Sequence, residues 1–484
     1  MTSNRAFEPG FTFVDLFAGI GGFHLALSEH GGRCVMACEI DDDCRKVYEN
    51  YFIKRKGETF QFPKDIRTLT KKDGTDELLS PDEIDKIVPD HDVLCGGFPC
   101  QPFSKGGAQQ GILDVTRGTL FQDIIQIVAA KRPKLVFLEN VRNLVGPKHR
   151  DTWGIIINSL ESLGYFVETE PLILSPHQFK REEGGKPQFR ERVFILAYRE
   201  KDFPEAPTAR VRVELLKRYG KKIQKEVLVG GWSPNSWSIK DYLETAEHID
   251  QYALSPAENS YLECWNYFVE NLNPEYALPS VPIWSYALEN DAHLTRKMPD
   301  WEKRFRVKLS AFYLHHKDFI DDWKKMKWGE NGLTISQFPP TRQKLEWQAD
   351  EVTGAKSKST NNNRTLKNLL IQFRPSGIRV KLPSYTPTLV AMNQTSIIGP
   401  ELWSDTSMGR YRRLTPWECC SLQGFPKEIF QDLSGSFNHK NEEYIYKQLG
   451  NAVCVSLISA LFNQLNNKDI LIKNEYTITP IPFS

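Results

Sequence analysis

The first 200 residues alternate short apolar runs with stretches in which apolar residues recur at helical spacing. The apolar runs contain many β-branched and aromatic residues, which is typical of buried strands. The predicted strands are Phe11–Phe17, Cys34–Ile40, Asp92–Phe98, Lys134–Val141 and Arg192–Arg199. The predicted helices are Gly22–His30, Asp43–Tyr51, Gly118–Lys131 and Thr152–Leu163. This alternation predicts an α/β domain with a parallel sheet covered on both faces, in which ligands bind at the carboxyl ends of the strands.

The pattern changes near Pro204, where the alternation of strands and helices stops. From there to about Pro383, tryptophans accumulate together with basic residues. Within this section Ala355–Arg364 is polar and of low complexity, which predicts a mobile loop or linker. The change indicates a separate domain. Its tryptophans are Trp232, Trp237, Trp265, Trp284, Trp301, Trp323, Trp328 and Trp347, and its basic residues include Arg210, Arg212, Lys217, Arg218, Lys221 and Lys222.

Regular patterning returns in the segment Arg413–Pro426. Thr415 is a favourable N-cap, Pro416 suits the first helical position and Gly424 suits the end, so a short helix is predicted here. The expected domains are residues 1–204, a second and smaller domain over residues 205–383, and a return to the first domain over residues 384–484.

Composition is that of an ordinary soluble globular protein, with 40% hydrophobic residues and a net charge of +1. Any contact with nucleic acid would therefore depend on local basic patches rather than on the field of the whole protein. The nine cysteines show no paired CxxC spacing, which predicts neither a disulfide framework nor a metal site. Without a signal segment or an apolar run of about 18 residues, we expect a soluble intracellular protein with no membrane partner.

A glycine-rich turn follows the first predicted strand, within the segment Phe13–Phe23. Gly19, Gly21 and Gly22 permit a tight turn and leave backbone N–H groups at the start of a helix, where an anionic group is favoured. Glu39 stands at the end of the second predicted strand, where a carboxylate can accept hydrogen bonds from ribose hydroxyls. Together these features indicate a nucleotide-type ligand, either a dinucleotide or S-adenosylmethionine. A glycine-rich turn with an acidic residue there by chance is the alternative.

Cys100 lies in a turn directly after the third predicted strand, in the sequence Gly-Gly-Phe-Pro-Cys-Gln-Pro-Phe-Ser. Pro99 and Pro102 restrict the backbone on either side of the thiol, and the preceding glycines allow a bound molecule to approach closely. A buried structural cysteine needs neither feature. Cys100 is therefore a candidate nucleophile, with an unusual turn as the alternative.

Three charged residues complete the candidate site. Glu139 ends the predicted strand Lys134–Val141, where poor solvation raises the pKa of a carboxyl group and equips it to donate a proton. Alternatively, Glu139 caps a helix or pairs with Arg142. Arg190 and Arg192 alternate at the start of the last predicted strand, so we expect them to project on the same side and to suit a phosphate or the edge of a base. As an isolated pair, they would be surface salt-bridge partners.

Four segments in this order resemble the DNA (cytosine-5) methyltransferase family: Phe-Ala-Gly-Ile-Gly-Gly, Gly-Phe-Pro-Cys-Gln-Pro-Phe-Ser, Glu-Asn-Val and Gln-x-Arg-x-Arg. Arg413-Leu-Thr-Pro and Gln448-Leu-Gly-Asn-Ala452 match the two late motifs of the family. The resemblance covers roughly residues 11–200 and 385–460, and residues 205–383 fall where the family has its variable target recognition domain. The chain departs from the family in a longer, more charged segment before Gln188, and in Ile40, where an aromatic residue often stacks on the adenine.

The resemblance implies an α/β fold of the Rossmann-like class I methyltransferase type, with a mixed, largely parallel sheet and a smaller target recognition domain. It implies transfer of a methyl group from S-adenosylmethionine to carbon 5 of a flipped-out cytosine in a specific sequence of double-stranded DNA, through a covalent adduct with Cys100. Glu139 would be the acid, and Arg190 and Arg192 would clamp the base and a phosphate. The residues implied to bind S-adenosylmethionine are Phe17, Gly19, Ile20, Gly22, Glu39, Asp65, Ile66, Leu120 and Asn451.

The same resemblance implies a monomeric bacterial enzyme that acts in the cytoplasm at the nucleoid and is paired with a restriction endonuclease. Two other functions remain open. The substrate is RNA in one branch of the family, but that branch has a short middle domain. A catalytically silent DNA-binding protein on this fold would not need the intact Pro-Cys pair, Glu139 and both arginines.

Overall fold

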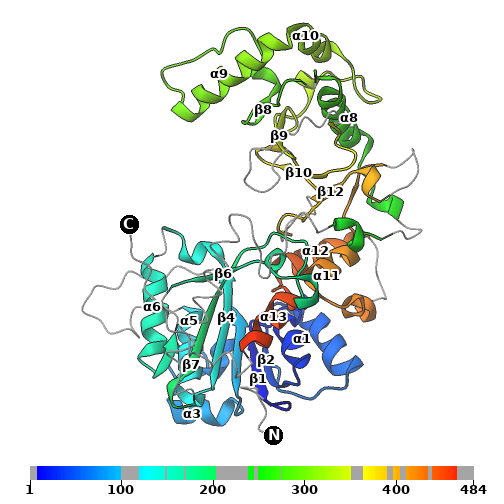
Figure 1. Ribbon diagram of the computed structural model, residues 1–484. Helices are drawn as coiled ribbons and strands as arrows, with labels where there is room; N and C mark the ends of the chain where they lie inside the picture. Colours follow the sequence, from blue (N-terminus) through cyan, green and yellow to red (C-terminus); the bar gives the residue numbers. More distant parts are fainter. Residues whose placement is uncertain are drawn as a thin grey trace, which may run out of the picture. The chain divides into compact units, whose positions relative to one another are not determined.

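The structure is a computed structural model that describes residues 8–99, 119–147, 150–167, 170–202, 238–244, 249–273, 275–349, 364–389, 396–403, 410–433 and 439–465. The chain forms two compact units (Figure 1). The first unit combines Met1–Trp232 with Cys420–Ser484, and the second unit is Ser233–Cys419. The first unit is therefore made from both ends of the chain.

The first unit is built on a seven-stranded sheet whose continuous order is β2-β1-β3-β4-β7-β5, with β6 also paired to β7. β1 is parallel to β2 and β3, and β3 is parallel to β4. β7 is antiparallel to β4, β5 and β6. The strands are β1 (Thr12–Leu16), β2 (Arg33–Cys38), β3 (Val93–Gly97), β4 (Leu135–Val141), β5 (Tyr165–Val167), β6 (Leu172–Leu174) and β7 (Arg192–Arg199).

The alternation of side chains along the central strands explains why helices cover both faces of this sheet. Val14 and Leu16 of β1 belong to a buried cluster that includes side chains of α3, α5 and α6. Phe13, one residue earlier, points to the opposite face and lies edge-on to His24 of α1, with ring centroids 5.3 Å apart. Figure 1 shows the two helical layers on either side of the strands. The helices are α1 (Gly22–Ser28), α2 (Asp42–Tyr48), α3 (Pro81–Ile87), α5 (Leu120–Lys131), α6 (Arg150–Glu161), α12 (His439–Asn451) and α13 (Val455–Leu465).

The five long strands predicted from the sequence are confirmed, with ends that differ by at most two residues. The two short strands β5 and β6 were not predicted, because three residues are too few to show a period. The expectation of a parallel sheet holds for β1 to β4, whereas β7 is antiparallel. A parallel neighbour needs a crossover connection, and the chain instead reaches β7 by reversing direction after β6.

The helix predicted after Thr415 is also confirmed. α11 spans Pro416–Gln423. The Thr415 hydroxyl accepts a hydrogen bond from the backbone N–H of Glu418, and Gly424 adopts a φ of 78°. The cap and the glycine therefore bound this helix as their chemistry predicts.

The second unit has its own sheet, in the order β13-β12-β10-β11-β9-β8, and its own core. Trp265 of α8 and Trp323 of α10 are fully buried in this core, with ring centroids 5.2 Å apart. The apolar residues that contact this core come from the helices α8 (Pro256–Asn271), α9 (Asp300–His315) and α10 (Lys317–Lys325) and from β8 (Ile283–Trp284), β9 (Lys344–Gln348), β10 (Leu370–Arg374), β11 (Gly377–Lys381) and β12 (Ser396–Ile398). β13 (Arg412–Arg413) completes the sheet.

The expected domain boundaries, after residues 204 and 383, differ from this division. β12 pairs with β10, and β13 pairs with β12, so residues up to Arg413 are hydrogen-bonded into the second sheet. The return to the first unit therefore comes later than the sequence pattern indicates. The basic residues Arg210–Lys222 and the predicted linker up to residue 363 lie outside the described residues.

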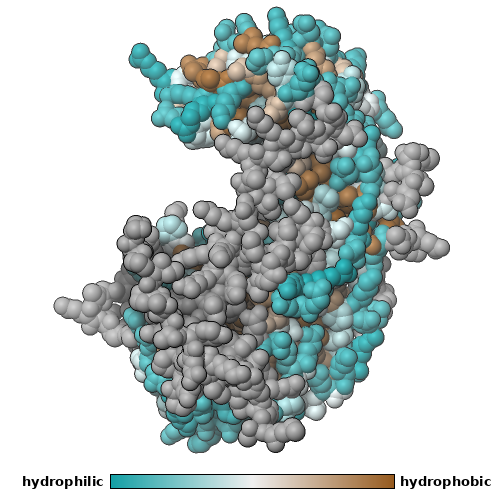
Figure 2. Space-filling view, in the orientation of Figure 1, coloured by the Kyte–Doolittle hydropathy of each residue, from teal (hydrophilic) through white to brown (hydrophobic). Residues whose placement is uncertain are grey.

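One stretch among the described residues, Glu442–Asn463, has the length and mean hydropathy of a membrane-spanning helix. However, 67% of its most apolar window is buried. α13, which forms its second half, packs against α1. A core helix of a folded domain passes the same test, so this stretch gives only weak evidence for a membrane span. Figure 2 shows hydrophobic residues within the largely hydrophilic surface of the second unit. The exposed large apolar side chains include Trp301, Val307 and Leu314 of α9.

Candidate active site

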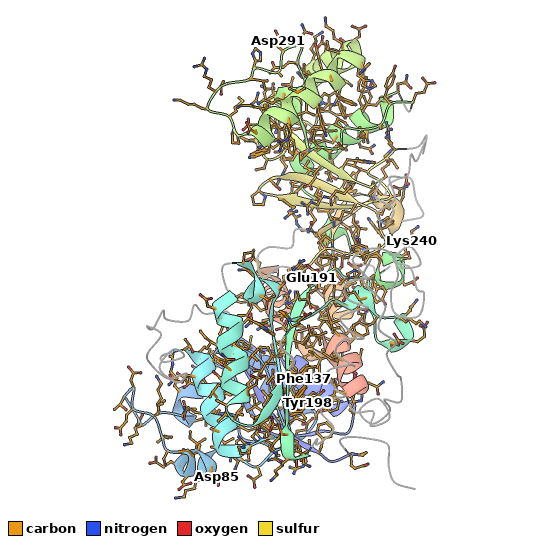
Figure 3. All side chains as sticks on the ribbon, turned by 60° about the vertical axis from the view of Figure 1, so that its left-hand side comes forward. Asp85, Phe137, Glu191, Tyr198, Lys240 and Asp291 are labelled. Atoms are coloured by element: carbon orange, nitrogen blue, oxygen red, sulfur yellow. The ribbon has the colours of Figure 1, made fainter. Side chains whose placement is uncertain are left out.

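The carboxyl ends of β1, β3 and β4 meet at one edge of the first sheet. Leu16 of β1 pairs with Gly96 of β3, and Gly97 pairs with Glu139 of β4. Because β7 is antiparallel, its first residue, Arg192, lies beside the end of β4. Figure 3 shows Glu191 at this edge and Asp85 at the opposite end of the unit. The predicted loop, acid and arginines are thus brought together, as expected for parallel strands.

The turn between β1 and α1 has the strained backbone that its glycines make possible. Gly19 and Gly21 have φ values of 54° and 88°. A Cβ atom on Gly21 would lie 2.3 Å from Phe52, and one on Gly22 would lie 2.5 Å from Val453. Phe17 also has a positive φ, 56°, which is uncommon for a residue with a side chain and is often found at functional sites.

Glu39 joins this turn to the loop after β2. One carboxylate oxygen accepts a hydrogen bond from the backbone N–H of Gly19, and the other accepts from the backbone N–H of Asp41, both at 2.7 Å. The side chain is buried, and burial raises the pKa of its carboxyl group. Each carboxylate oxygen of Glu39 thus already accepts one hydrogen bond from the backbone. To accept from ribose hydroxyls as predicted, Glu39 would use the second lone pair of an oxygen.

The other residues predicted to bind the cofactor lie in several elements of the first unit. Ile20 and Ile66 are buried, and Asp65 caps the short helix Ile66–Leu69 through the backbone N–H of Arg67. Leu120 begins α5, and Asn451 ends α12 with an exposed side chain. Ile40, which follows Glu39, is 60% exposed, so an apolar surface does stand where the family often has an aromatic ring.

Glu139 is 7% exposed, and its Oε1 lies 2.8 Å from Nε of Arg192. Burial raises the pKa of Glu139, while the nearby charges of Arg192 and Arg190 oppose the increase. The alternative pairing of Glu139 with Arg142 is not observed, because Arg142 contacts Glu191 instead. A buried carboxyl group with a raised pKa at a strand end is typical of a catalytic acid.

The two arginines have different surroundings. Arg192 is partly exposed and contacts Glu139. Arg190 is 1% exposed, and its Nη2 donates to the carbonyl oxygens of Gly450 and Ala452, at 2.9 and 2.6 Å. The alternative of two surface salt-bridge partners is therefore wrong for Arg190. Both charges act on Glu139, but Arg190 also contacts the backbone at the end of α12.

Cys100 lies outside the described residues, which stop at Pro99 and resume at Thr119. The residues that directly precede Cys100 are described. Gly97 pairs with Glu139, and the side-chain amide of Asn140 donates to the carbonyl oxygen of Phe98 at 2.9 Å. The backbone two residues before Cys100 is therefore hydrogen-bonded directly beside the candidate acid.

Sequence reasoning missed three residues of the first unit: Asp15, Asn140 and Gln423. Asp15 is fully buried in β1, where burial raises the pKa of its carboxyl group well above the usual value. An acidic residue in an otherwise apolar strand was the available signal. Asn140 follows Glu139 in the Glu-Asn-Val segment, but the sequence predicts no role for its side chain. The side-chain amide of Gln423 donates to the carbonyl oxygen of Leu449 at 2.9 Å. For neither amide does the sequence indicate a partner.

Comparisons with known proteins show the family of this chain. The family model described as "C-5 cytosine-specific DNA methylase" matches residues 11–467. The type II methyltransferase M.AluI of Cellulosimicrobium cellulans is 32% identical over 95% of this chain and 92% of its own length. The type II methyltransferase M.HhaI of Haemophilus parahaemolyticus is 38% identical over 39% of this chain and 50% of its own length.

A solved structure, that of the S. pombe Dnmt2 methyltransferase, aligns with 94% of this chain and 98% of its own. Its sequence identity is 16% and its TM-score is 0.47, which is too low to support a functional comparison.

Proposed function

The chain belongs to the C-5 cytosine-specific DNA methylase family, and on that basis we propose that Cys100 and Glu139 carry out methylation of a cytosine within a specific DNA sequence, with S-adenosylmethionine as the donor. The chain is a DNA cytosine methyltransferase by family membership. The proposal concerns its residues, its donor and its partners.

The observation that carries the proposal is the position of Glu139. Its carboxyl group is buried, has a raised pKa and is held by Arg192. It stands beside Gly97, three residues before Cys100. Methylation at carbon 5 of cytosine needs a thiolate and a proton donor at a short distance from one another. The pairing of Gly97 with Glu139 supports this, because it puts the proposed donor beside the strand that leads to Cys100.

The residues around the β1–α1 turn fit S-adenosylmethionine. A Cβ on Gly19 would meet no atom within 4 Å, so this glycine leaves open space on the turn. The exposed apolar side chain of Ile40 suits one face of an adenine, and the exposed amide of Asn451 lies at the end of α12. Phe17, Gly19, Ile20, Gly22, Glu39, Asp65, Ile66, Leu120 and Asn451 would hold the molecule. When bound, it supplies an electrophilic methyl group on a sulfonium.

Carbon 5 of cytosine is a weak nucleophile, so the protein must first make it electron-rich. The Cys100 thiolate adds to carbon 6 of the ring, and Glu139 gives its proton to nitrogen 3, so that the ring becomes a neutral enamine. Carbon 5 then takes the methyl group. Loss of the carbon 5 proton to solvent, expulsion of the Cys100 thiolate and return of the nitrogen 3 proton to Glu139 restore the neutral aromatic ring.

The arginine beside Glu139 orients the acid and faces the base. Arg192 holds Oε1 of Glu139 at 2.8 Å, which leaves Oε2 as the oxygen that can carry the proton. A base stacked in a duplex cannot present its face to a thiol, so the cytosine must be flipped out, at a cost of a few kcal/mol. The second unit would act as the target recognition domain whose contacts offset that cost.

Three further proposals concern the partners and the location of the protein. Two of the relatives reported above are named type II methyltransferases, which supports pairing with a restriction endonuclease. We expect a monomer that acts in the cytoplasm, at the nucleoid. Bisulfite sequencing of DNA from a bacterial host that expresses the protein tests activity and target sequence together, because methylated cytosines at one recurring sequence are the expected result.

The substrate is tested by incubating the protein with tritiated S-adenosylmethionine and either duplex DNA or transfer RNA. Label in DNA is the expected result, and label in RNA alone would overturn the proposal. The nucleophile is tested with a duplex containing 5-fluorocytosine, which should form a stable covalent adduct because fluorine cannot leave as a proton does. The Cys100→Ser variant should form no adduct and transfer no methyl group while still binding DNA, and turnover by it would mean that the nucleophile is another residue.

A further inference from the structure

The last carbonyl groups of α12 receive hydrogen bonds from two side chains of distant segments. A helix leaves its final carbonyl oxygens without partners inside the helix. Gln423 at the end of α11 donates to Leu449, at 2.9 Å. Arg190 donates to Gly450 and Ala452, at 2.9 and 2.6 Å. The two side chains therefore fasten the backbone on both sides of Asn451.

Arg190 is well suited to this contact. A cation is favoured at the carboxyl end of a helix, and a guanidinium can donate to several oxygens in one plane. Burial lowers the pKa of Arg190 to about 9, so the group stays charged at neutral pH. Its own backbone N–H donates to the hydroxyl of Ser175 at 2.8 Å, which fixes the position from which the side chain reaches α12.

The fastened segment lies against the candidate cofactor turn. Val453 is close enough to Gly22 that a Cβ there would lie 2.5 Å from its methyl group. A Cβ on Gly97 would lie 3.2 Å from the other methyl group of Val453 and 3.4 Å from Oε2 of Glu139. A displacement of the segment would therefore change the packing of the turn and the position of Asn451 together.

We propose that Arg190 and Gln423 are positioning residues which hold the segment Asn451–Val453 against the β1–α1 turn and thereby shape the methyl-donor site. Arg190 then acts on donor binding through the backbone of α12, while Arg192 acts on the acid and the base. The inference rests on the proposed function, because it assumes that S-adenosylmethionine binds beside Asn451.

The test compares Arg190→Lys with Arg192→Lys in the full-length protein. Calorimetric titration with S-adenosylmethionine, without DNA, measures donor binding directly, and steady-state kinetics separate KM for the donor from kcat. Hydrogen bonds to charged groups typically contribute enough that losing one or two weakens binding by about 10- to 100-fold. We expect Arg190→Lys to raise Kd and KM for the donor by this factor. We expect Arg192→Lys to lower kcat and change the donor Kd less than about twofold.

A second variant removes the hydrogen bond that α11 makes to the same segment. Gln423→Leu removes the donor to Leu449 and should also raise the donor Kd, by about threefold to tenfold. It tests the proposal even if Arg190→Lys does not fold. Arg181→Lys, in the exposed turn Arg181–Glu183, is the matched control and should bind the donor as the unaltered protein does.

The outcomes separate the two proposals. If the unaltered protein binds S-adenosylmethionine and both variants bind it equally well, the positioning role is wrong. A fall in kcat alone for Arg190→Lys, as for Arg192→Lys, would assign Arg190 to the base instead. If the unaltered protein binds no S-adenosylmethionine, the proposed function itself fails, and this inference fails with it.

Discussion

The two units bury polar side chains in different ways. In the first unit, Asp15, Glu39 and Glu139 are buried carboxyl groups whose pKa values are raised, chiefly by burial. Among the described residues of the second unit, Arg412 and Glu418 form a bidentate pair at 2.7 and 2.9 Å with both side chains fully buried. The first unit thus retains buried carboxyl groups whose pKa values are raised, while in the second unit the buried carboxylate of Glu418 is paired with Arg412.

This difference shows where chemistry is expected. A carboxyl group with a raised pKa reduces the stability of the folded state at neutral pH, since folding must hold it in surroundings that disfavour its charge. Such groups at a single sheet edge indicate a reactive site. The second unit has an apolar core in which aromatic rings contact one another, as the pair of Trp265 and Trp323 shows.

The largest expected effect concerns the acid of the first unit. Glu139→Gln keeps the shape of the side chain and removes the proton that it donates, so kcat should fall by about 10²- to 10⁴-fold. Single-turnover methylation measures the change. Glu161→Gln, at the exposed end of α6, is the matched control and should leave kcat unaltered. Equal rates for both variants would mean that Glu139 is not the proton donor.

The second prediction concerns the core of the second unit. Trp265 is fully buried, and its indole N–H donates to the carbonyl oxygen of Arg342 at 2.8 Å. Trp265→Ala should lower the free energy of unfolding by about 3–5 kcal/mol. Trp301→Ala removes a side chain that is 48% exposed and should cost far less. Scanning calorimetry measures both, and similar losses would contradict the conclusion that burial of Trp265 stabilises this core.

The third prediction is acid sensitivity of the first unit. His91 is buried, and burial lowers its pKa to about 4 from an ordinary value of 6.5. Between these values the unfolded chain binds a proton that the folded protein does not, so stability should be lost as pH falls from 6.5 toward 4, by at most about 3 kcal/mol.

The matched variant is His91→Asn, which retains a side-chain donor for the carbonyl oxygen of Pro89 that His91 contacts at 2.8 Å. Urea unfolding at pH 7 and pH 4.5 should show a smaller loss for the variant than for the unaltered protein. An identical loss would mean that other groups cause the acid sensitivity.

The smallest expected effect is at the surface of the second unit. Lys325 and Asp322 of α10 lie 3.3 Å apart with side chains 75% and 81% exposed. Exposed pairs at this helical spacing contribute little, so Lys325→Ala should change the free energy of unfolding by less than about 0.5 kcal/mol. A larger change in urea unfolding would show that this pair does more than its exposure suggests.

Much of the first unit could be predicted from local pattern. Buried strands are continuous apolar runs, and the segment Arg192–Arg199 coincides with β7. The glycines of the β1–α1 turn were identified because their residue type permits the positive φ that the structure has. The second unit was recognised only by a change of character, because its helices and strands do not alternate and its sheet joins residues far apart in the chain.

The amino-acid sequence by itself determined the five long strands of the first unit, the glycine-rich turn, the carboxyl group at the end of β4 and the family. Each of these depends on residues that are neighbours in the chain, so local spacing is enough to reveal them. Only the tertiary structure decided the antiparallel direction of β7, the late return to the first unit and the contacts of Arg190. The spacing predicted that Arg190 and Arg192 project on the same side, but the structure gives them different partners. Arg190 donates to the backbone carbonyl of Gly450, 260 residues away in the chain, whereas Arg192 contacts Glu139.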